Sequence, residues 1–151
     1  MNSPLPNWGN VVGVASDGWS LKSAIDELGY LGFSASQVGI ATHQDTVHQI
    51  QVMGDSDSRT THHPGMTRRL LLISRHFPEI DSAILAGTLA ANLSNYPDSN
   101  LAGLLTYMGV LGEEASRYER DFRKGTSLVT VNAGRRAAIA GLVLQRINAM
   151  S

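Results

Sequence analysis

The chain has 151 residues, of which 42% are hydrophobic and 17% are charged, and this composition is typical of one globular domain with a buried core. It contains no cysteine, which excludes disulfide bonds and thiolate metal sites. Residues 1–58 carry one Lys against six acidic residues, whereas residues 59–151 carry eleven Lys or Arg against seven. This asymmetry is compatible with an anionic partner, with head-to-tail self-association, or with neither.

The first 42 residues predict an arm followed by a strand, a helix and a second strand. Residues 1–8 contain two prolines but no basic or long apolar segment, so we expect a flexible arm, no signal peptide and a cytoplasmic protein. One domain is expected over residues 9–151. Strands are predicted at residues 10–15 and 37–42, and if they are parallel neighbours their connection should be right-handed. Asp17 is a favourable N-cap for the helix between them. The apolar residues of that helix recur at helical spacing: Leu21, Ala24, Ile25, Leu28 and Leu31.

The middle of the chain predicts a loop and then helices. Residues 43–65 are expected to form a mobile loop region, in which Val47, Ile50 and Val52 either extend a strand or form a hairpin. One helix is predicted from Thr67 to about His76. A second is expected to start at Pro78, which is tolerated in a first turn, and to end near Asn95. A turn at residues 96–99 precedes a third helix. Its apolar positions lie on one face: Leu101, Leu104, Leu105, Met108 and Leu111.

Residues 109–132 carry the strongest local signals in the chain. Glu113 and Glu114 lie in the first turn of a predicted helix, where the helix dipole favours acids. The cations Arg120, Arg123 and Lys124 lie in its last turn. Gly125 is expected to end the helix in a left-handed conformation. A β-branched strand at residues 126–131 and a final helix at about residues 135–147 follow.

The order of elements is therefore a βαβ unit, a helical middle and an αβα unit. The economical arrangement of these elements is a small sheet covered by helices, an α+β fold of the α/β sandwich type.

Both ends of the chain resemble the general stress protein 17M-like (heat-induced stress protein) domain family. The N-terminal likeness lies in residues 10–15, in the helix with Ala24, Ile25 and Leu28, and in residues 32–34 and 38–41. The C-terminal likeness is in residues 109–115, 117–119, 122, 124–125 and 128–131. The resemblance implies this fold and an association with bacterial stress. It implies no catalytic residue.

No pattern of chemistry-bearing residues predicts an enzyme, a cofactor site or a metal site. A zinc site needs three or four converging ligands, and the five histidines (43, 48, 62, 63 and 76) are expected to be solvated loop residues, with a metal or pH-sensitive contact as the alternative. Paired acids at 26/27, 55/57 and 113/114 are explained as surface residues rather than as a catalytic pair. No phosphate-binding glycine motif and no nucleophile elbow is present.

Two features in the middle are candidate contact sites. The segment 59–77 contains four arginines and no acid, and Arg68, Arg69 and Arg75 are its candidate anion-binding residues. A surface helix docked on the core explains the same segment. The second candidate is a stripe of small residues at four-residue spacing, which would let helices approach closely within one subunit or between subunits: Ala83, Gly87 and Ala91.

We therefore expect a non-enzymatic, bacterial, stress-associated protein that acts through protein–protein contacts and self-associates, with residues 66–112 as the contact region. The alternative is a regulatory module whose Arg-rich segment 59–77 binds an anionic ligand, a lipid surface or nucleic acid. No transmembrane segment is expected, because Pro97 and Asp98 interrupt the apolar region.

Overall fold

A computed structural model of the chain describes residues 10–57, 66–80 and 82–150, so the predicted arm at residues 1–8 lies outside it. Within these ranges, five strands form one antiparallel sheet with the order β1-β5-β2-β4-β3. The strands are β1 (Asn10–Ala15), β2 (Val38–His43), β3 (Ser74–His76), β4 (Ala83–Gly87) and β5 (Ser127–Asn132).

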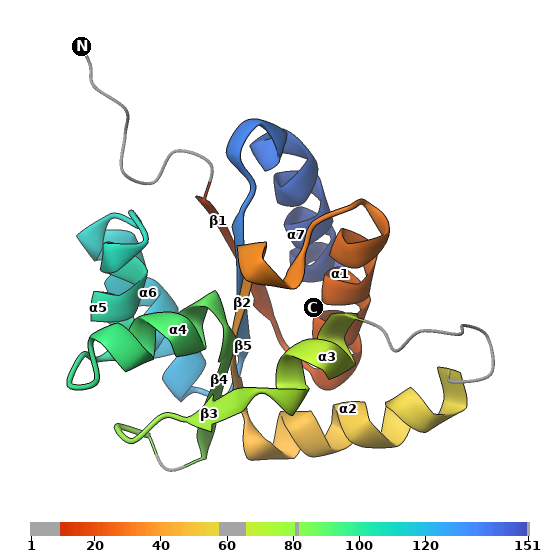
Figure 1. The fold of residues 1–151 in the computed structure, drawn as a ribbon, viewed down its shortest axis with the longest axis horizontal. Coiled ribbons are helices and arrows are strands. Elements are labelled where there is room, and N and C mark those ends of the chain that lie inside the picture. The colour runs from red at the N-terminus through yellow and green to blue at the C-terminus, as the bar shows by residue number, and fades with distance from the viewer. Residues whose placement is uncertain (1–9, 58–65, 81, 151) are drawn as a thin grey trace.

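Helices cover both faces of the sheet, which gives three layers (Figure 1). One face is covered by α1 (Gly18–Tyr30), α2 (Gln44–Asp57), α3 (Met66–Leu72) and α7 (Ala137–Met150). The other is covered by α4 (Thr88–Asn95), α5 (Leu101–Tyr107) and α6 (Gly112–Arg123). Two short 3-10 turns, η1 (Ala35–Gln37) and η2 (Gly134–Arg136), precede β2 and α7. The predicted α+β fold, with a small sheet covered by helices, is confirmed.

The N-terminal βαβ unit forms as predicted but is split by another strand. Asp17 caps α1 by accepting a hydrogen bond from the Ser20 amide at 2.8 Å. The apolar face of α1 is buried through Leu28, whereas Leu31 follows the helix and is 38% exposed. Strands β1 and β2 run parallel but are not neighbours, because β5 lies between them and pairs antiparallel with both. The unit is therefore a split βαβ arrangement.

The C-terminal helix–strand unit forms where the sequence predicts it. Helix α6 has Glu113 and Glu114 in its first turn and Arg120 and Arg123 in its last. Gly125 has a φ of 114°, a conformation that a side chain would disfavour. Strand β5 then lies inside the sheet between β1 and β2, and five of its six residues are buried.

The predicted loop at residues 43–65 is wrong for its first part. Residues 44–57 form helix α2, and residues 58–65 lie outside the described ranges. Thr46 and Ile50, one turn apart, are buried on the same side of α2. Val52, which we expected in a strand or hairpin, is 62% exposed on this helix. The β-branched residues suggested a strand, but burial follows the helical period instead.

The predicted helices at residues 67–76 and 78–95 are each wrong in part, because a strand replaces the end of the first and the beginning of the second does not form a helix. Helix α3 ends at Leu72 and the edge strand β3 follows, while β4 occupies Ala83–Gly87 before α4 begins. Because β4 lies inside the sheet with helices on both faces, its sequence Ala-Ile-Leu-Ala-Gly is apolar throughout. A continuous apolar run of this length does not distinguish a central strand from a buried helix.

The small-residue stripe therefore does not exist as a helix surface. Ala83 is fully buried in β4, Gly87 ends that strand with a φ of 65°, and Ala91 lies on α4. The turn at residues 96–99 is confirmed by the hydrogen bond from the Ser99 amide to the Tyr96 carbonyl. The following helix is shorter than predicted. Leu111 is the N-cap residue of α6 and is 63% exposed.

Candidate functional site: a groove with two arginines

An open cavity of about 540 Å³ lies where α3, β3 and α4 meet, next to η1. We call it the arginine groove. Its apolar wall consists of Leu70 and Ile73 from the α3 end and Ala90 and Ala91 from α4, together with Ala35. Its polar groups come from Arg69, Arg75, Ser36, Thr88 and Ser94. The groove therefore combines an apolar wall with two cations.

The helix α3 and the edge strand β3 place the two arginines. On α3, the buried Leu70 fixes the helix against the core, and the adjacent Arg69 remains exposed. Arg75 lies in the middle of β3, paired with Leu85 of β4. Its guanidinium donates a hydrogen bond to Ser94 Oγ on α4. Arg75 thus connects the edge of the sheet to the helix across the groove.

The charge of this site is not neutralised within the described part of the chain. The described residues that line the groove include no Asp or Glu, and among the described residues neither Arg69 nor Arg75 forms an ion pair with a carboxylate. A concave surface with one sign of charge raises the local concentration of ions of the opposite sign. The groove is therefore suited to an anionic group.

The start of α4 adds to the positive potential of the groove. Gly87 and Thr88 line the cavity, and no side chain caps α4 at its N-cap, Gly87. The first amides of a helix carry a partial positive charge. This contribution supports the two arginines but does not define a site alone.

Large apolar side chains continue from the groove onto the surface. Leu72 and Ile73, at the end of α3, are each 80% exposed. Ile73 also lines the groove, so the apolar surface and the cations adjoin. A ligand that covers both would present an anion and an apolar group.

The structure brings together only part of what the sequence suggested. Arg69 and Arg75 lie in one groove, together with Gly87 and Ala91, whereas Ala83 is buried away from it. The side chain of Arg68 lies outside the described part of the structure. Ser94 is a groove residue that sequence reasoning missed. Its contact with Arg75 depends on β3, which the sequence pattern did not predict.

Among the candidate histidines and acids, His43 and Asp26 each make contacts that connect separate elements of the fold. His43 stacks on Phe122 with ring centroids 4.3 Å apart, and its Nε2 donates to the Phe122 carbonyl at 2.9 Å. Asp26 pairs with Lys22 and accepts hydrogen bonds from the Thr67 amide and hydroxyl. In the described ranges no three His, Asp or Glu side chains gather as a metal site would require. His62 and His63 lie outside those ranges.

The Tyr118 hydroxyl has a clearly shifted pKa. Burial raises the pKa of the Tyr118 hydroxyl above its usual value of 10.0, and the nearby Glu114 carboxylate raises it further. Tyr118 packs against the core on the α6 side of the sheet, away from the arginine groove. Its shift therefore reflects packing and does not indicate a catalytic centre.

Comparisons of the chain with protein-family models, with curated proteins and with solved structures found no match. None of the helices in the described residues is long and apolar enough to cross a membrane.

Proposed function

We propose that this chain is a non-enzymatic binding module, and that its arginine groove binds an acidic segment of a protein partner. The observation that carries the proposal is the pair Arg69 and Arg75, without a carboxylate among the groove residues, on an apolar wall that continues to Leu72 and Ile73. A segment with an acidic side chain next to a large apolar one complements both parts of this surface.

Two further parts of the proposal rest on the sequence. The resemblance to the general stress protein 17M-like family supports a role in bacterial stress in the cytoplasm. The charge asymmetry between residues 1–58 and 59–151 supports self-association, with a second copy of the chain as one candidate protein partner.

Selection of peptides from a displayed random library against the purified protein tests the groove even though the natural partner is unidentified. We expect enrichment of sequences that combine Asp or Glu with Leu, Ile or Phe. Their binding, followed by fluorescence anisotropy, should weaken about tenfold or more in Arg69→Glu/Arg75→Glu, which corresponds to at least about 1.4 kcal/mol. It should also weaken with added salt.

A matched control changes the same number of charges elsewhere. Arg117 and Arg120 are exposed on α6, on the opposite face of the sheet from α3, so Arg117→Glu/Arg120→Glu should leave peptide binding unchanged. If the selected peptides bind the groove variant as tightly as the wild type, the proposed site is wrong.

Sedimentation velocity of the wild type and both variants identifies whether the partner is a second copy. An oligomer that dissociates in Arg69→Glu/Arg75→Glu and persists in the α6 control assigns the groove to self-association. A wild-type monomer that binds the selected peptides assigns it to a different protein.

An anionic small ligand, lipid surface or nucleic acid is the alternative occupant. Nucleic acid is disfavoured because the described residues that line the groove include no aromatic side chain, and stacking on aromatic rings is a major source of affinity for single strands. A lipid surface fits the exposed Leu72 and Ile73. Flotation with vesicles that contain phosphatidylglycerol, lost in the groove variant, would support lipid over a protein segment.

A further inference from the structure

A pair of exposed, stacked tyrosines lies at the turn between α4 and α5. The rings of Tyr96 and Tyr107 have centroids 3.9 Å apart and planes 13° apart. Tyr96 is 43% exposed and Tyr107 is 57% exposed. Stacking covers one face of each ring, and both residues remain partly open to solvent. We call this pair the tyrosine platform.

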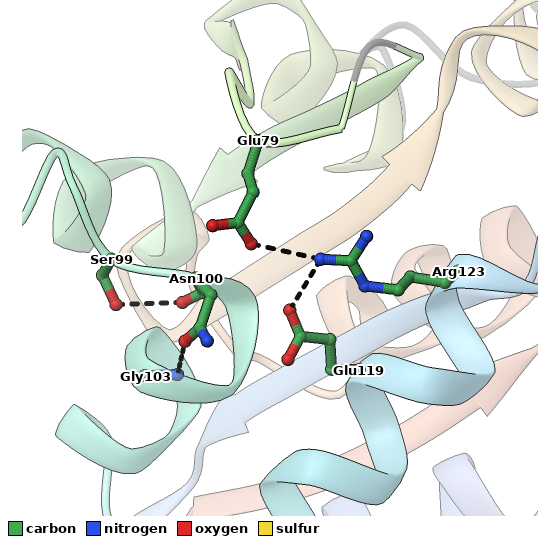
Figure 2. Close-up of polar contacts among 6 residues, drawn as sticks. All are labelled: Glu79, Ser99, Asn100, Gly103, Glu119 and Arg123. Carbon is green, nitrogen blue, oxygen red and sulfur yellow. Dashed lines mark hydrogen bonds and ion pairs between the residues drawn. The ribbon is translucent and has the colours of Figure 1, made fainter.

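The platform borders a second open cavity, of about 560 Å³, whose other lining residues are Asn95 and the turn residues 97–100. The turn is fixed by local hydrogen bonds: Ser99 Oγ donates to the Asn100 carbonyl at 2.9 Å, and Asn100 Oδ1 accepts from the Gly103 amide at 2.7 Å (Figure 2). The second of these bonds caps α5. The cavity therefore has a defined wall.

Several hydrogen-bonding groups at this cavity are available to a ligand. Among the described residues, the side chains of Asn95 and Asp98 have no hydrogen-bond partner, and the Asn100 side chain uses its oxygen to cap α5. An amide offers both donors and acceptors, whereas the Asp98 carboxylate accepts only. A ligand here must supply donors as well as a flat or apolar face.

We propose that the tyrosine platform binds an uncharged carbohydrate. The C–H face of a sugar ring packs on an aromatic ring, and its hydroxyls donate to Asp98 and exchange hydrogen bonds with Asn95 and Asn100. None of the described residues that line the cavity is Lys or Arg, which disfavours phosphates and nucleic acid. A proline-rich segment fits less well because proline has no N–H to donate to Asp98.

This site is independent of the proposed function. It lies at the C-terminal end of α4, and it shares no lining residue with the arginine groove. The ligand classes also differ, since the groove residues include two cations and the residues that line this cavity include one acid.

Ligand-observed NMR with glucose, maltotriose, cellotriose and chitotriose tests the inference. We expect saturation transfer from the protein to the ring C–H protons of at least one of these sugars at millimolar concentration. The dissociation constant should rise about tenfold or more in Asp98→Ala, which changes an exposed turn residue, and in Tyr107→Ala. Tyr107→Phe, which keeps the ring, should retain binding.

Tyr30 provides the matched control. It is 80% exposed and lies on α1, across the sheet from the platform, so Tyr30→Ala should leave sugar binding unchanged. If no sugar in the panel shows transfer, or if Asp98→Ala and Tyr107→Ala bind as the wild type does, the inference is overturned.

Discussion

Gly87 is the position where the structure makes the sharpest stability prediction. It ends β4 with φ 65° and ψ −137° and serves as the N-cap of α4. A Cβ atom at this residue would lie 2.0 Å from the Val38 carbonyl oxygen and 3.3 Å from the Gly39 Cα atom. Both contacts are with the backbone of β2, which pairs with β4. The strands would therefore have to separate to accommodate Gly87→Ala.

The size of the effect follows from two contributions. Holding a non-glycine residue in a sparsely populated backbone region costs about 1–3 kcal/mol. Overpacking against neighbours that do not move freely costs about 1–3 kcal/mol more. We therefore expect Gly87→Ala to lower the free energy of unfolding by roughly 3 kcal/mol or more, which for a chain of this length lowers Tm by about 6–12 °C.

Thermal unfolding followed by circular dichroism measures this effect, and Gly141→Ala is its control. Gly141 lies inside α7, and a Cβ atom there would meet nothing within 4 Å. Alanine in a helix interior should stabilise the protein by about 0.5–1 kcal/mol relative to glycine. If residues 78–95 formed one helix, as the sequence predicts, Gly87→Ala should also stabilise the protein. A Gly87→Ala variant that melts at or above the wild-type Tm would refute the strand and the strained turn together.

Two further predictions concern α6. The folded state favours the neutral hydroxyl of Tyr118, because burial and Glu114 raise its pKa. This stabilisation is complete below the unfolded pKa of about 10 and is lost as pH rises above it. In urea titrations, Tyr118→Phe should therefore lose less stability than the wild type between about pH 9 and pH 11. Arg123 forms ion pairs with Glu79 at 3.2 Å and Glu119 at 3.3 Å (Figure 2), but its side chain is 49% exposed, so Arg123→Ala should cost no more than about 1 kcal/mol. A larger loss that persists in high salt would show that these ion pairs are not screened as exposed pairs are.

The elements that the sequence predicted well carry local signals that agree. In α6 and β5, the acids at the helix start, the cations at its end and Gly125 all favour the same boundaries. Asp17 likewise marks the start of α1 through its own side chain. Such signals act within a few residues, so they are readable from the sequence without the tertiary structure.

The elements that the sequence missed depend on tertiary contacts. The apolar run Ala83–Gly87 becomes a strand because β2 and β3 pair with it on its two sides. Helix α2 forms although its sequence is poor in strong helix formers, since Thr46 and Ile50 are buried. Tertiary burial overrides local propensity in both segments.

The candidate site was likewise predictable from the sequence only in part. The cationic character of Arg69 and Arg75 was evident from a segment without acids. Their meeting in one groove was not, because it requires α3 to end at Leu72 and β3 to pair with β4. The contact of Arg75 with Ser94 then joins residues that the predicted helices would have placed differently.

Helix α4 contributes to both proposed sites, so a variant that tests one site must leave the position of this helix unchanged. Its residues Thr88, Ala90, Ala91 and Ser94 line the arginine groove, and Tyr96 follows its last residue, so its position affects both the groove and the tyrosine platform. Because Gly87 fixes where α4 begins, Gly87→Ala is expected to disturb both cavities as well as stability. Loss of binding in that variant would not assign a ligand to either one. Arg69→Glu/Arg75→Glu and Asp98→Ala change exposed side chains outside α4, and each should affect only its own ligand.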